Sequence, residues 1–87
     1  MNLYLIRRIH NRFIEDAFAY AVVAAETGKA ARHTHPTRGV VWQGTMWTRF
    51  GRDYGFEIWA NPKNVRSQLL GIASLGTKAG MICTSFN

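Results

Sequence analysis

Residues 20 to 36 read YAVVAAETGKAARHTHP, and this stretch decides the fold because it holds the densest apolar run, a helix-start signal and a stop. Every residue from Ala17 to Ala25 is apolar or aromatic. Such a run suits a strand buried on both faces as well as a core helix. A single long helix from Phe13 to Thr27 is one interpretation, because this segment has five alanines and neither Gly nor Pro.

The residues after the apolar run favour the strand. Thr27 is a good N-cap residue, and residues 29–32 are good helix formers, so a new helix can begin there. Pro36 then restricts the residue before it to extended conformations and ends the element. We therefore predict a strand over about 18–25 that runs into a short helix over about 28–34.

Other segments complete a small mixed domain. Met1–Ile9 alternates like a strand, and Val65–Ser74 and Met81–Phe86 are predicted as two more strands. Pro62 can open one helical turn, while glycines divide Thr37–Gly55 into pieces that are either brief strands or an ordered loop. We predict one α+β domain over residues 1–87, with a mostly antiparallel sheet of about four strands and one short helix packed on one face.

Composition points to a basic domain. The 87 residues carry a net charge of +6, and the Lys and Arg residues are dispersed, so a partner is expected to be anionic. The single cysteine, Cys83, cannot form an internal disulfide, which suggests a reducing compartment. No apolar run approaches the roughly 20 residues that span a bilayer, and residues 1–9 do not resemble a signal peptide. We expect a cytoplasmic protein with no membrane partner.

Two patterns resemble chemical sites. His33 and His35 form an HxH pair, but a metal site needs three or four ligands, and no carboxylate lies within the motif. We predict that His33 favours the helix C-terminal dipole and that Pro36 fixes His35. Cys83 lies between apolar residues of the last strand and is predicted to be a buried, inert thiol. We therefore expect no catalytic residue, no metal and no cofactor, and a protein that is not an enzyme.

The aromatic and basic segment Trp42–Trp59, WQGTMWTRFGRDYGFEIW, is the best functional candidate. Aromatic rings interleaved with arginines can stack on bases and neutralise phosphates, and they are also enriched in protein interfaces. In a domain this small, most of these rings must also fill the core, which leaves the arginines and one or two rings for binding. The candidate binding residues are Trp42, Trp47, Arg49, Arg52, Tyr54 and Trp59.

Four segments carry a resemblance: MNLYLIRRI at residues 1–9, AVVAAETGKAARHTHP at 21–36, NVRSQLLGIAS at 64–74 and GMICTSFN at 80–87. Together they resemble a family of short hypothetical proteins encoded by bacteriophages and prophages. The resemblance covers about half of the chain and skips residues 37–63. Members have an acidic run in the helix, where this chain has Gly28, Lys29, Arg32 and His33. No activity is known for the family, so no functional residue is carried over.

The resemblance implies a phage setting and the cytoplasm of a bacterial host. Small phage proteins often act by stoichiometric binding, so the expected function is binding to a host protein or complex with an acidic surface, including inhibition of a defence system in the manner of an anti-CRISPR protein. A homodimer through an exposed edge strand, such as Met81–Phe86, is compatible with this. The alternative is a nucleic-acid-binding module that uses the aromatic and Arg residues of 42–59.

Overall fold

The structure is a computed structural model that describes residues 1–9, 18–54 and 59–86. The elements follow one another as β1 (Asn2–Arg8), β2 (Phe18–Ala25), α1 (Gly28–Arg32), β3 (Val41–Trp42), β4 (Trp47–Arg49), β5 (Arg52–Asp53), the 3-10 turn η1 (Pro62–Asn64), β6 (Val65–Ile72) and β7 (Gly80–Phe86). Two sheets and one short helix result, so the predicted α+β class is confirmed. No helix in these ranges is long and apolar enough to cross a membrane.

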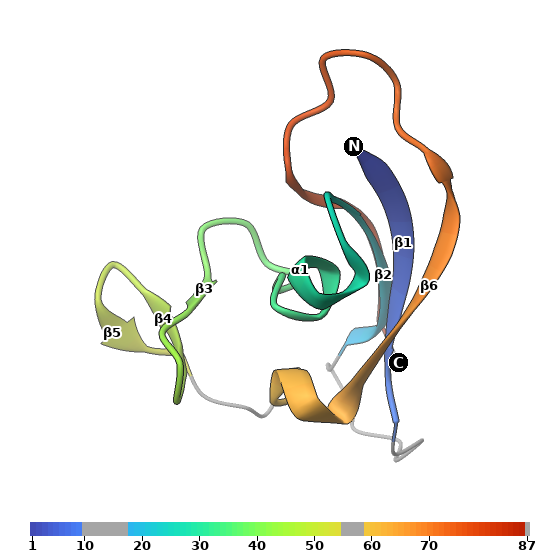
Figure 1. Ribbon diagram of the computed structural model, residues 1–87. Coiled ribbons are helices and arrows are strands. Elements are labelled where there is room, and N and C mark those ends of the chain that lie inside the picture. Colours follow the sequence, from blue (N-terminus) through green and yellow to red (C-terminus); the bar gives the residue numbers. More distant parts are fainter. Residues whose placement is uncertain (10–17, 55–58, 87) are drawn as a thin grey trace.

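A four-stranded antiparallel sheet in the order β6-β1-β2-β7 forms the larger layer, referred to below as the large sheet (Figure 1). The apolar run of residues 18–25 is β2, a central strand between β1 and β7. The single-helix interpretation of residues 13–27 is therefore wrong over this strand, because residues 18–25 form a ladder on both sides. Residues 10–17, expected to connect the first two strands, lie outside the described ranges.

The helix begins as predicted and ends earlier. Thr27 is the N-cap, and its side-chain oxygen accepts a hydrogen bond from the Ala30 N–H at 3.1 Å. The helix ends at Arg32 rather than at Thr34, because Thr34 already forms a β-bridge with Val41. The chain therefore leaves the helix directly towards the second sheet.

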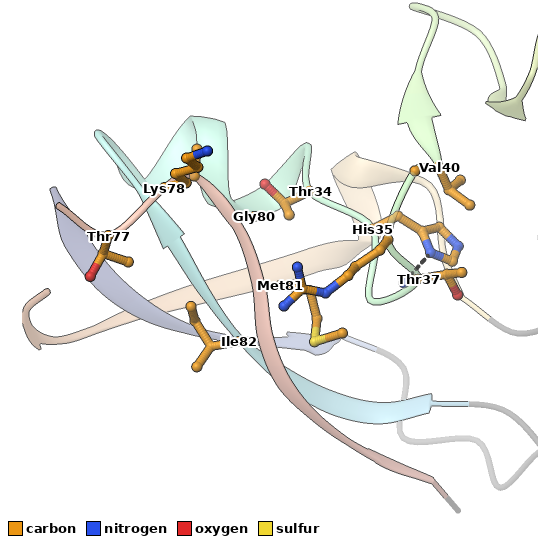
Figure 2. A pocket seen from close by; sticks show the side chains of 12 residues that line it. Thr34, His35, Thr37, Val40, Thr77, Lys78, Gly80, Met81 and Ile82 are labelled. Atoms are coloured by element: carbon orange, nitrogen blue, oxygen red, sulfur yellow. Dashed lines mark hydrogen bonds between the residues drawn. The ribbon is translucent and has the colours of Figure 1, made fainter.

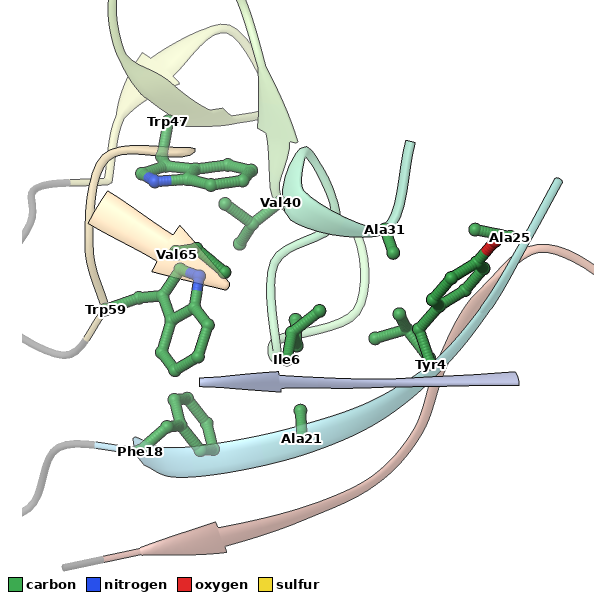
Figure 3. Close-up of a cluster of buried hydrophobic side chains, with 11 residues drawn as sticks. Tyr4, Ile6, Phe18, Ala21, Ala25, Ala31, Val40, Trp47, Trp59 and Val65 are labelled. Carbon is green, nitrogen blue, oxygen red and sulfur yellow. The ribbon is translucent and has the colours of Figure 1, made fainter. Parts of the chain in front are cut away.

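Side chains of β1 and β2 alternate between two faces of the large sheet. The inner face, which carries Tyr4, Ile6, Ala21 and Val23, is buried, and α1 contributes the fully buried Ala31 to the same cluster. Figure 3 shows Tyr4, Ile6, Ala21 and Ala31 in one cluster with the rings of Phe18, Trp47 and Trp59. The core thus lies on one side of the large sheet, where α1 and the second sheet also lie (Figure 1).

The segment left open as strands or loop forms a small antiparallel sheet in the order β3-β4-β5, referred to below as the small sheet. Its strands are two or three residues long, and Trp47 of β4 reaches from it into the core. The predicted helical turn at Pro62 is confirmed as η1, with Asn61 accepting the Lys63 N–H at 3.1 Å. The turn leads straight into β6.

The far end of β6 lies beyond the cover of the helix. Leu69, Leu70 and Ile72 are exposed, with 83% of the Ile72 surface accessible. A five-residue helix is only about 8 Å long, whereas an eight-residue strand such as β6 extends about 26 Å. Because α1 is so short, it covers only part of the strand and leaves the other part open.

The Thr27 cap gives a direct test of the strand-to-helix junction. Replacement of Thr27 by Ala removes the acceptor for the Ala30 N–H and should lower the free energy of unfolding by about 1 kcal/mol. Thr27→Ser keeps a hydroxyl acceptor and should stay within a few tenths of a kcal/mol of the parent. Urea unfolding of the three proteins measures both values, and equal loss in both variants would contradict the cap.

Candidate functional site

The structure separates the six predicted binding residues into two groups. Trp47 and Trp59 are buried in the core, and Trp42 and Tyr54 are partly buried and pack against it. Arg49 and Arg52 are exposed. The two fully buried tryptophans are thus structural, and of the six predicted residues the two arginines are the exposed ones.

These arginines flank the turn of the β4–β5 hairpin. Arg49 and Arg52 are directly opposite each other in the ladder, and only Phe50 and Gly51 connect them. A two-residue turn of this kind has positive φ at both central positions, and φ is 53° at Phe50 and 76° at Gly51. We call Arg49-Phe50-Gly51-Arg52 the hairpin tip.

Phe50 belongs to the aromatic and basic segment but was not among the six candidate binding residues. Its ring is 91% exposed, and the Arg49 guanidinium carbon lies 5.4 Å from the ring centroid. A bulky residue with positive φ is uncommon and costs of order 1 kcal/mol, and an Asn-Gly turn would avoid this strain. Gly51 was the one sign of this two-residue turn in the sequence. Phe at the first turn position gave no such sign, because residues that tolerate positive φ are preferred there.

His35 is enclosed by aromatic rings beneath the small sheet. Its ring centroid lies 4.9 Å from that of Trp47, 5.4 Å from that of Tyr54 and 6.4 Å from that of Phe18, all edge-on. The Thr37 N–H donates to His35 Nδ1 at 2.8 Å, which places the proton of the neutral ring on Nε2. Burial lowers the pKa of His35 to about 4, so the imidazole is neutral at physiological pH.

The HxH pair does not converge. His33 is exposed and its Nδ1–H donates to the Lys29 carbonyl oxygen at 2.7 Å, as suits a helix C-terminus, whereas His35 points into the core. Among the described residues, no group of three or more His, Cys, Asp or Glu side chains could hold a metal ion. The prediction of a buried Cys83 is wrong, because the thiol is exposed on a strand face that no described element covers.

A groove opens between the segment after α1 and the start of β7 (Figure 2). A cavity of about 420 Å³ lies between residues 34–40 and 77–82, and a second of about 400 Å³ adjoins it beside Trp42. Its described lining carries hydroxyls and the cations Arg38 and Lys78, with no carboxylate and no thiol. The groove therefore suits contact with an anionic group, and the neutral ring of His35 also lines it.

Comparison with known proteins gives no relative: no family model, no curated protein and no solved structure matches the chain.

Burial of His35 predicts a loss of stability in mild acid. The pKa of His35 is about 6.5 in the unfolded chain and about 4 in the folded protein. As the pH falls, the unfolded state therefore takes up a proton at His35 before the folded state does. This contribution to stability is complete above about pH 7 and is lost as the pH falls from about 6.5 towards 4. Between pH 7 and pH 5 we expect the free energy of unfolding to fall by about 2 kcal/mol.

Urea unfolding at a series of pH values measures this loss, and NMR of the imidazole should show His35 still neutral at pH 5. His33→Gln is the control and should keep the pH dependence, because the exposed ring of His33 lies outside the core. A His35 ring that is already protonated at pH 6 in the folded protein would contradict the prediction.

Proposed function

We propose that the protein acts by binding, without catalysis, and that the hairpin tip contacts a protein partner with an acidic surface. The observation that carries this proposal is Phe50, whose ring is 91% exposed in a strained backbone conformation between two exposed arginines. Exposed aromatic and Arg side chains are the usual anchors of protein interfaces. The positive φ opposes stability and the exposed ring buries little apolar surface, so the contact of Arg49 with the ring is the one gain that folding draws from this arrangement.

The charges of the hairpin tip also favour an acidic partner. Arg49 and Arg52 are directly opposite each other, and like charges in this position destabilise a hairpin. An acidic partner would relieve the repulsion and speed association. The phage resemblance extends the proposal to a host factor, with a defence complex as one such target. That extension stays a prediction.

Replacement of Phe50 by Asn tests the hairpin tip without harming the fold. The variant restores an Asn-Gly turn and should raise the free energy of unfolding by about 1 kcal/mol, since Asn tolerates positive φ. It should also abolish capture of the partner from a host extract, compared by quantitative mass spectrometry with the parent protein. Loss of binding together with higher stability cannot be explained by unfolding.

Leu75→Ala is the matched control, because Leu75 is also fully exposed but lies in the turn between β6 and β7. It should capture the same partner as the parent. Equal capture by the Phe50 variant, or recovery of nothing but the protein itself, would overturn the proposal.

A second candidate is self-association along β6. In the part of the chain that the structure describes, β6 and β7 are the edges of the large sheet, so the expected edge position of Met81–Phe86 is confirmed. On β6 three large apolar side chains are exposed, Leu69, Leu70 and Ile72, whereas on β7 the large apolar side chain known to be exposed is Ile82. An exposed apolar edge is self-complementary when two copies pair antiparallel about a two-fold axis.

Sedimentation velocity tests this dimer. The parent protein should sediment as a dimer. Ile72→Lys should shift it to monomer, because it would bury a charge where the two β6 strands pair. Ile82→Lys on the opposite edge is the control and should leave the dimer intact. A monomeric parent protein, or a dimer lost only with Ile82→Lys, would contradict pairing along β6.

A further inference from the structure

The large sheet has a second face, opposite to the core. Side chains at Leu3, Leu5 and Arg7 of β1 alternate with the buried Tyr4 and Ile6 and therefore point away from α1. The register brings side chains of the neighbouring strands to the same face, and we call this set the outer face: Leu3, Leu5, Arg7, Tyr20, Val22, Ala24, Arg66, Gln68 and Cys83. Ala24, opposite Leu3, is fully buried, so the open part of the outer face is the end that carries Arg7 and Tyr20. The described helix and small sheet both lie on the other side of the large sheet (Figure 1).

One row of the outer face is cationic and aromatic. Arg7 of β1 is directly opposite Arg66 of β6 on one side and Tyr20 of β2 on the other. All three are exposed, Tyr20 to 45%. Neighbouring strands are about 4.8 Å apart, so two guanidinium groups and a phenol ring lie in adjacent positions across three strands.

No described acidic residue balances this row. The acidic residues that the structure describes, Glu26 and Asp53, lie outside the four strands of the large sheet. Like charges directly opposite each other destabilise a sheet, so Arg7 and Arg66 repel without a described partner. An anion bound between them would remove that repulsion.

The next row along the strands is apolar. Leu5 and Val22 are directly opposite each other and are half-buried, with Gln68 and Cys83 exposed beside them. The outer face thus combines an apolar surface formed by Leu5 and Val22, the exposed ring of Tyr20 and two guanidinium groups. A base can stack on the ring of Tyr20 and contact the apolar surface while the phosphates pair with the arginines.

We propose that the outer face binds single-stranded nucleic acid, with Tyr20 stacking on a base and Arg7 and Arg66 contacting phosphates. Open four-stranded sheets can hold two or three unstacked bases in this way. The site differs from the nucleic-acid site expected within residues 42–59, because Trp47 and Trp59 there are buried in the core. It also lies on the side of the large sheet away from the hairpin tip.

Other occupants fit the outer face less well. An anionic membrane would be bound by protruding apolar side chains, whereas Leu3, Leu5 and Val22 are only half-exposed. A second copy stacked on this face would bring two Arg7–Arg66 pairs together with no described acidic side chain between them. Recognition of a duplex needs an element that enters a groove of the nucleic acid. The outer face is the side of a sheet and does not protrude far enough to enter a groove.

Fluorescence anisotropy with labelled oligo(dT) and oligo(rU) tests the site over a range of salt concentrations. The parent protein should bind at low salt, and Tyr20→Ala should weaken binding about tenfold or more while Tyr20→Phe keeps it, since stacking needs only the ring. Arg7→Gln with Arg66→Gln should lower the slope of log affinity against log salt by about 1.4, because each arginine would neutralise one phosphate of the single strand.

Arg49→Gln with Arg52→Gln is the matched control, because it removes the same charge from the hairpin tip. It should leave the salt slope and the effect of Tyr20→Ala unchanged. Equal weakening by the two double variants would show general charge attraction and overturn the site, as would no binding of the parent protein at low salt. Binding to phosphatidylserine vesicles but not to either oligonucleotide would assign the face to a membrane instead.

The substituted side chains are all exposed, so each variant should keep the circular dichroism spectrum and melting temperature of the parent. Partner capture through Phe50 is measured separately, and its failure would leave this inference standing.

Discussion

The buried ring of Trp47 is the contact on which the rest of the structure depends. The strands of the small sheet are too short to be stable alone. Trp47 attaches that sheet to the core by packing on His35, and its Nε1–H donates to the Ala60 carbonyl oxygen at 2.9 Å. Ala60 lies just before the turn that leads into β6, so one side chain joins the small sheet, the segment after α1 and an edge of the large sheet.

Capping and proline residues in the sequence predicted where the helix and the 3-10 turn begin. The Thr27 cap and the Pro62 turn each restrict one backbone position, and the structure has a helix start or a turn at each. Pro36 did not set the end of the helix, which falls at Arg32. Exposure was harder to predict, because it depends on how far a five-residue helix reaches and on which face stays uncovered. Cys83 was misplaced for that reason, since its apolar neighbours do not indicate which way the strand faces.

The sequence predicted that the candidate site lies within residues 42–59, but it did not predict that Phe50 is its most exposed ring. Aromatic and basic composition singled out residues 42–59, and Arg49 and Arg52 are exposed there, yet composition could not separate core rings from surface rings. Trp47 is buried on the short β4, whereas Arg49 at the end of that strand is exposed. Phe50 is exposed because a two-residue turn projects its side chain away from the small sheet, and that backbone conformation contradicts its propensity.

A core confined to one side of a sheet has an evolutionary consequence. Substitutions at Leu3, Arg7 or Tyr20 change a face on which no described helix or strand packs, so most of them should alter stability by less than a substitution at Ile6 or Val23. Selection can therefore adjust the chemistry of that face while the inner packing stays constant. A small protein that must follow a changing target gains from this separation, because recognition can diverge faster than the scaffold.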